Sequence, residues 1–230
     1  MTVSERVASS LQRDIFAGAI KPGERLPPER ELAVSFKANR NAVREALKRL
    51  EQLGLVETRH GSGTRVKNYL QSGSMEALVG ALASAPESIP PTIWRDALDF
   101  RVYYNPAVAH LAATRGDAKK AHLLAGWMLE LKQSANPLAW SRAEQGWMDT
   151  LVAAAENQMF ILMQNSVSNA FKSGTGLSEV LFAHREEIER AYEQVGDAVA
   201  KKDAPRAMSK LWALMEAERG WLQRLAAPNF

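Results

Sequence analysis

Apolar residues recur at helical spacing along almost the whole chain of 230 residues, and this spacing is the feature that most limits its fold. A helix with one buried face needs apolar residues three and four positions apart, whereas a half-buried strand needs strict alternation. Two short segments, LVETR at 55–59 and TRVKN at 64–68, have instead the composition of strands. The sequence therefore predicts a mainly α-helical protein with a small β-hairpin.

The segment HGSG, residues 60–63, joins the two strand-like segments. Glycines beside basic residues can cradle a phosphate, but a phosphate-binding loop leads directly into a helix whose N-terminal amides point at the anion. Here a second strand follows the loop. We therefore interpret Gly61 and Gly63 as the turn of the hairpin, where glycine adopts backbone angles that other residues tolerate poorly.

Three short helices are predicted before this hairpin. Apolar residues four positions apart indicate the first, from Val3 to near Gly18. Pro28 is well placed to open the second helix, and Asn39 to cap the third, which Gly54 ends. Three short helices and a hairpin within about 65 residues indicate a winged helix-turn-helix, in which the third helix enters the major groove of DNA and the hairpin is the wing.

The predicted third helix carries Arg40, Arg44 and Lys48 four positions apart, on a face other than its apolar one. The first 70 residues hold 13 Lys and Arg against 8 Asp and Glu, although the whole chain holds 29 against 26. Positive charge concentrated in this part favours an anionic partner such as nucleic acid. A merely solvated basic face is the alternative, and it leaves unexplained why the stripe, the turn and the wing coincide.

From residue 69 onward, helical patterns succeed one another with capping residues and helix breakers between them. The predicted helices are 74–84, 91–114, 118–134, 137–154, 158–173, 177–200 and 204–226. An all-helical bundle of about seven helices follows. The expected domains are a winged helix-turn-helix over 1–68, a linker over 69–75 and a helical domain over 76–230.

Composition excludes several classes of protein. The chain has no cysteine, so disulfides, thiolate metal sites and cysteine nucleophiles are excluded. Its sequence has no apolar run near the ~20 residues of a membrane span and no secretory signal, so we expect a cytoplasmic bacterial protein with no membrane partner. Signatures of hydrolases, zinc proteases and nucleotide-binding loops are also missing from the sequence, so an enzyme or a helical scaffold is only the alternative function.

The run GERLPPERELAVSFKANRNAVREALKRLEQLGLVETRHGSGTRV resembles the DNA-binding domain of the GntR family of bacterial transcription regulators. The helical remainder is similar to the ligand-binding domain of the FadR subfamily, through DALDFRVYYNPAVAHLAATRG and AAAENQMFILMQNSV. The resemblance implies transcription regulation by a small-molecule effector. It also implies DNA contacts from Arg30, Asn39, Arg40, Asn41, Ala42, Arg44, His60 and Gly61.

The chemistry of these residues agrees with most of the implied contacts. The guanidinium groups of Arg40 and Arg44 can each form a bidentate pair with O6 and N7 of guanine. Ala42, where relatives often have a hydroxyl residue, offers only an apolar contact such as one to a thymine methyl. One winged domain reads a half-site of a few base pairs, so we expect a homodimer on a palindromic double-stranded operator.

Many relatives of this subfamily bind a divalent metal through one aspartate and three histidines, on which a small carboxylate effector sits. The corresponding positions of this chain are Glu144, Met148, Tyr192 and Leu214. A lone carboxylate holds a transition metal poorly, so we predict no metal there and no cofactor. A rebuilt site from His110, His184 and Glu144 is the alternative, together with a metal-dependent carboxylate effector.

In lacking these metal ligands, the chain resembles the fatty-acid-responsive FadR branch. In that branch a long-chain acyl-CoA occupies the helical bundle and weakens operator binding. Arg101 matches that branch's effector-contacting arginine and can pair with a carboxylate or phosphate. The expected effector site consists of Arg101, Trp147, Met148, Tyr192, Leu214 and Trp221. Methionine and tryptophan at helical spacing are, however, more often part of an ordinary core than of a ligand site.

Overall fold

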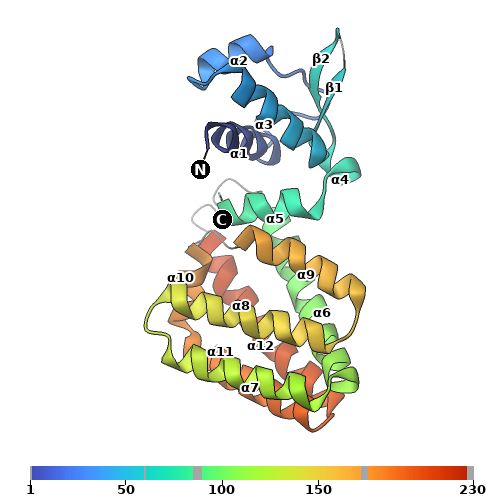
Figure 1. Ribbon diagram of the computed structural model, residues 1–230, viewed down its shortest axis with the longest axis vertical. Helices are drawn as coiled ribbons and strands as arrows, with labels where there is room; N and C mark the ends of the chain where they lie inside the picture. The colour runs from blue at the N-terminus through green and yellow to red at the C-terminus, as the bar shows by residue number, and fades with distance from the viewer. Residues whose placement is uncertain (1, 60, 85–89, 172–175, 227–230) are drawn as a thin grey trace. The chain divides into compact units, whose positions relative to one another are not determined.

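The computed structural model describes residues 2–59, 61–84, 90–171 and 176–226 (Figure 1). The chain divides into two compact units, residues 1–90 and 91–230. Both units are built from helices, and the one sheet among the described residues is a two-stranded antiparallel hairpin in the N-terminal unit. The predicted fold class, a winged helix-turn-helix followed by a helical domain, is confirmed.

The N-terminal unit contains five helices and the hairpin within its described residues. Its elements are α1 (Val3–Phe16), α2 (Glu29–Ser35), α3 (Arg40–Gln52), β1 (Val56–Arg59), β2 (Gly63–Val66), α4 (Tyr69–Ser72) and α5 (Met75–Ser84). α1 and α3 pack together, and their apolar stripes are buried, with Val7, Val43 and Leu50 fully enclosed. Burial of these stripes is what the four-residue spacing predicted.

The hairpin pairs Val56 with Val66 at its open end and Arg59 with Gly63 next to the turn. Gly61 and Gly63 both have φ of +75°, a left-handed conformation that favours glycine. Their interpretation as the turn of a hairpin is therefore confirmed. Arg25 forms an isolated β-bridge with Arg65, which adds one residue pair of a third strand at the edge of β2.

Gly54 ends α3 and brings the chain against α4. Its φ is +74°, and a Cβ at this position would lie 1.8 Å from the carbonyl oxygen of Ser72. The Ser72 hydroxyl in turn donates to the Gly54 carbonyl at 2.8 Å. On α5, the Ala77 carbonyl accepts a bond from Gln12 of α1 at 2.6 Å. α4 and α5 thus pack with the N-terminal unit, and the domain limits expected from the sequence remain a prediction.

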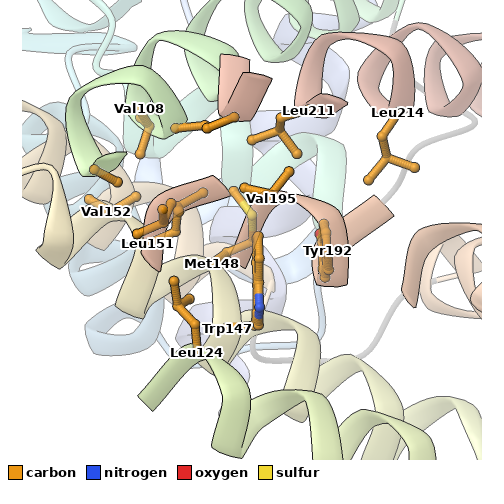
Figure 2. Close-up of a cluster of buried hydrophobic side chains, with 14 of the residues drawn as sticks. Val108, Leu124, Trp147, Met148, Leu151, Val152, Tyr192, Val195, Leu211 and Leu214 are labelled. Atoms are coloured by element: carbon orange, nitrogen blue, oxygen red, sulfur yellow. The ribbon is translucent and has the colours of Figure 1, made fainter. Parts of the chain in front are cut away.

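The second unit is a helical bundle. Its helices are α6 (Pro91–Arg115), α7 (Ala118–Gln133), α8 (Pro137–Ala154), α9 (Gln158–Phe171), α10 (Gly176–Ala183), α11 (Arg185–Ala200) and α12 (Ala204–Ala226). Figure 2 shows part of its core, to which α6, α7, α8, α11 and α12 all contribute buried side chains. No helix in the described ranges is long and apolar enough to cross a membrane.

The prediction of one continuous helix over 177–200 is wrong. The structure has two helices there, α10 and α11, which are separated at His184. The Leu181 carbonyl accepts from the His184 amide, so a tighter turn replaces one turn of α-helix. No glycine or proline marks this break within the segment 181–188, so the local sequence offers no signal for it.

Candidate nucleic-acid interface and helical-core site

Asn39 begins the predicted recognition helix α3. Its side-chain Oδ1 accepts a hydrogen bond from the backbone N–H of Ala42 at 2.8 Å, so the expected cap is confirmed. The cap fixes where α3 starts and hence which residues stand in its first turn. Arg40 and Asn41 are exposed there, and Ala42 is half-buried.

Arg40 and Arg44 are both exposed, as a DNA-contacting role requires. Within the part of the chain that the structure describes, the Arg40 guanidinium has no hydrogen bond or ion pair. The Arg44 guanidinium instead forms two bonds with Glu29, from Nε to Oε1 at 3.3 Å and from Nη2 to Oε2 at 2.9 Å. This hydrogen bonding lowers the pKa of the Glu29 carboxyl, against a smaller opposing effect of burial.

The remaining predicted DNA contacts come from α2 and from the hairpin. Arg30 is exposed on α2, and Gly61 is exposed in the hairpin turn. His60 lies outside the described residues. Arg65, also at the wing, donates from Nη1 to the carbonyl of Gly23 at 2.9 Å, so its guanidinium is held against the segment between α1 and α2.

In the helical unit, the five apolar residues of the expected effector site are buried members of one core cluster. The rings of Trp147 and Tyr192 are stacked, with centroids 3.8 Å apart and planes within 2° (Figure 2). Trp221 stacks instead on His184, at 3.9 Å between centroids. These side chains pack as an ordinary core does, and their role in effector binding stays a prediction.

A polar cluster lies within this core and joins four helices. Arg101 of α6 donates to Glu218 of α12 at 2.5 Å, and the Tyr192 hydroxyl of α11 donates to Glu144 of α8 at 2.9 Å. Glu218 is only 2% exposed, whereas 33% of the Arg101 side chain is exposed. The expected effector-binding arginine therefore already has a buried acidic partner, which sequence reasoning missed.

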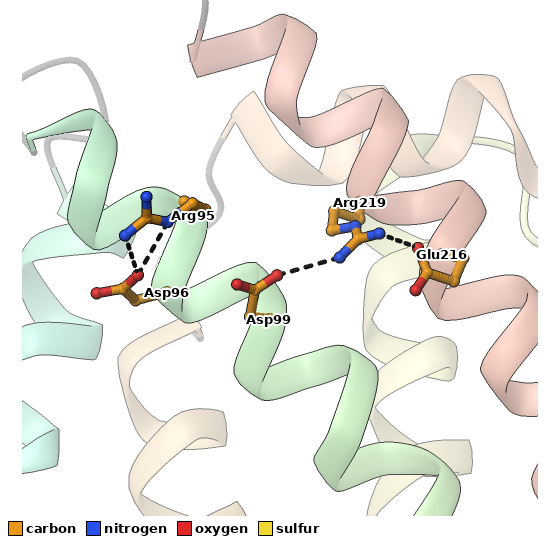
Figure 3. Close-up of polar contacts among 5 residues, drawn as sticks. All are labelled: Arg95, Asp96, Asp99, Glu216 and Arg219. Carbon is orange, nitrogen blue, oxygen red and sulfur yellow. Dashed lines mark hydrogen bonds and ion pairs between the residues drawn. The ribbon is translucent and has the colours of Figure 1, made fainter.

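A second ion pair joins α6 to α12 near the first. Arg219 donates from Nη1 to Asp99 at 3.1 Å and also pairs with Glu216 on its own helix (Figure 3). Arg95, one turn before Asp99, pairs only with the neighbouring Asp96 among the residues drawn. Two charged contacts, Arg101 with Glu218 and Asp99 with Arg219, therefore connect the first and last helices of the unit.

Glu144 has an unusual ionisation. Burial raises the pKa of its carboxyl to about 7, a rise that Glu218 increases and the Arg101 charge opposes. Trp147, on the same helix, has a buried indole Nε1 with no hydrogen-bond partner among the described residues. The cluster thus contains one carboxyl that holds a proton near neutral pH and one donor without an acceptor.

Glu144→Gln is expected to make the free energy of unfolding less dependent on pH. The folded protein binds this proton more tightly than the unfolded chain does, because the pKa rises from 4.5 to about 7. The resulting stabilisation is complete below pH 4.5 and is lost as the pH rises through 7. Its full size is on the order of 3 kcal/mol, and thermal unfolding between about pH 5 and 8 measures most of it.

The exposed Glu130 of α7 supplies the control for that experiment. Glu130→Gln removes the same charge from the surface and should leave the slope of stability against pH unchanged. A Glu144→Gln variant with the wild-type slope would show that Glu144 titrates in the folded protein much as it does in the unfolded chain.

The residues at the position of the relatives' metal site do not fit a metal ion. Glu144 is the one carboxylate of the four, and its Oε1 already accepts from the Tyr192 hydroxyl. Met148 and Leu214 offer no nitrogen or oxygen donor. Among the described residues, no group of three or more His, Asp or Glu is placed to hold a metal, and this includes the alternative set built on His110 and His184.

Comparisons with known proteins match both units. Residues 3–66 match the family model described as bacterial regulatory proteins of the gntR family, and residues 96–217 match the FCD domain model. The chain is 31% identical over 215 residues to the HTH-type transcriptional regulator Mce2R of Mycobacterium tuberculosis, covering 94% of this chain and 89% of that protein. It is 27% identical to the Glc operon transcriptional activator of Escherichia coli, covering 98% of this chain and 95% of the activator.

A solved structure shows the same fold. Lar, described as controlling the expression of the Listeria monocytogenes agr system, superimposes with a TM-score of 0.67 at 18% sequence identity. The match covers 98% of both chains, so it includes both units.

Proposed function

This chain belongs to the GntR family of bacterial regulatory proteins and carries an FCD domain. On this basis we propose that it acts in the bacterial cytoplasm and binds a palindromic DNA operator as a homodimer. The observation that carries this proposal is the first turns of α3, where Arg40 and Arg44 are exposed behind a formed Asn39 cap. A short reading helix of this kind covers only a few base pairs. Two copies related by a two-fold axis supply the affinity and match the symmetry of a palindrome.

The helical domain would carry the effector, and we propose an acid with an apolar tail, of the acyl-CoA type. Arg101 supports an acidic head group, because a third of its side chain is exposed although its partner Glu218 is buried. The buried apolar residues around Trp147 and Met148 would have to move apart to admit the tail. The effector acts only if it binds the operator-competent and operator-incompetent arrangements of the dimer unequally.

Native mass spectrometry of the purified protein, before and after denaturation, tests both parts of this proposal. The homodimer should appear at twice the chain mass of 25.4 kDa, with an acyl species released on denaturation. A monomer at micromolar concentration would contradict the dimer. A released divalent ion in place of an acyl species would favour the metal-dependent small-carboxylate alternative.

A further inference from the structure

The contact between Arg44 and Glu29 has a defined geometry. Glu29 is the first residue of α2 and Arg44 lies in the second turn of α3, so the pair joins the two helices of the helix-turn-helix. The carboxylate takes the side of the guanidinium formed by Nε and Nη2. Both of its oxygens are used, so the guanidinium plane is fixed rather than free to rotate.

The edge that Glu29 leaves open is the end of the guanidinium. The parallel N–H bonds of Nη1 and Nη2 at that end are the pair that matches O6 and N7 of a guanine. The Arg44 side chain remains 57% exposed despite its contact, and its Nη1 has no hydrogen bond to the described residues. Glu29 thus occupies the Nε–Nη2 edge of the guanidinium and leaves the Nη1–Nη2 edge free to pair with a base.

Charge gives the contact a second effect. An arginine without a partner attracts any phosphate, which raises affinity for all DNA sequences alike. The pKa of the Glu29 carboxyl is lowered by the Arg44 hydrogen bonds, so Glu29 stays ionised and offsets the Arg44 charge near neutral pH. Arg40 has no hydrogen bond or ion pair within the described residues, and the Glu29 charge acts on it less strongly than on Arg44, so Arg40 keeps more of its attraction for phosphate.

We propose that Glu29 is a specificity-determining residue, which holds Arg44 for recognition of one base pair and limits its attraction to phosphates. The proposal rests on the proposed function, because it requires Arg44 to contact the operator. The Glu29–Arg44 ion pair should add little to the stability of the fold, because exposed ion pairs contribute little to the free energy of folding. Glu29 is a positioning residue in this scheme and touches no base itself.

Selection from a library of randomised DNA duplexes tests the proposal and does not require the operator sequence. The full-length protein and Glu29→Gln are each used to select bound sequences, and dissociation constants are then measured for the best duplex and its single-base variants. We expect Glu29→Gln to lose preference at one position in each half-site by about fivefold or more, while its affinity for random duplexes rises. Its melting temperature should change little.

Glu45→Gln is the matched control. It removes the same charge from the recognition helix, but Glu45 contacts Lys48 and not Arg44. This variant should raise affinity for random duplexes and keep the wild-type base preference at every position. A further comparison, Arg44→Ala with and without Glu29→Gln, should show no additional loss of preference, because Glu29 acts through Arg44.

Two results would overturn the proposal. Glu29→Gln could keep the wild-type discrimination at all positions, which would show that Arg44 needs no positioning. It could instead bind the best duplex more tightly with undiminished discrimination, in which case Glu29 merely competes with DNA for Arg44. Failure of the proposed function looks different, because the wild-type protein would then select no sequence at all.

Discussion

Arg40→Ala is expected to abolish the gel shift of the selected operator. Arg40 stands exposed in the first turn of α3, and its guanidinium has no protein partner in the described part of the chain. A bidentate contact with a base contributes roughly 1–3 kcal/mol, and the proposed dimer makes it twice. Affinity should therefore fall by a factor of about 30 to 10⁴. Binding of ligands to the helical unit should be unaffected.

Lys48→Ala provides a comparison on the same helix. Lys48 is also exposed and basic, but it lies two turns further along α3 and pairs with Glu45 at 3.5 Å. Its loss should weaken binding to all sequences slightly and to similar extents, as loss of a phosphate contact does. Unchanged gel shifts with Arg40→Ala would mean that α3 is not the reading helix. Melting temperatures close to that of the wild type should accompany both variants, since neither side chain is buried.

Arg101→Met is expected to destabilise the helical unit by about 3 kcal/mol. The substitution keeps much of the side-chain volume but leaves the Glu218 carboxylate, which is 2% exposed, without its partner. Removing one member of a buried ion pair typically costs about 3–5 kcal/mol, and the partial exposure of Arg101 places the expected value at the lower end. Urea unfolding followed by circular dichroism measures the loss.

The double variant Arg101→Met with Glu218→Leu separates the ion pair from simple packing. Replacing both charges by apolar side chains removes the stranded carboxylate, so most of the lost stability should return. If the double variant is as unstable as Arg101→Met, the arginine stabilises the unit through its packed stem and not through its charge. A loss below about 1 kcal/mol in the single variant would mean that water reaches Glu218 readily.

Local patterns predicted the N-terminal unit in detail. The Asn39 cap, the glycine turn of the hairpin and the buried stripes of α1 and α3 each depend on residues within a few positions of one another. Such features follow from backbone preferences and helical periodicity, which are visible in one sequence. The exposed positions of Arg40 and Arg44 followed from the same periodicity.

The partners of the functional residues were not predictable in this way. Glu29 and Arg44 are 15 positions apart, and Arg101 and Glu218 are 117 apart. Both pairs depend on how helices pack, which the spacing of residues along one helix does not encode. A core residue and a residue lining a ligand site have the same periodicity, so the sequence could not distinguish these roles for Trp147 or Tyr192.

The two ion pairs between α6 and α12 place Arg101, the proposed effector-binding residue, at the contact between the first and last helices of the helical unit. Under our proposal, an acidic ligand that draws the Arg101 guanidinium away from Glu218 would remove one of the contacts between α6 and α12. Asp99 and Arg219, the hydrogen bond from Asn105 to Met215 and the apolar packing between the two helices would still hold them together. Such a ligand would therefore act first on α6, the helix with which the helical unit begins.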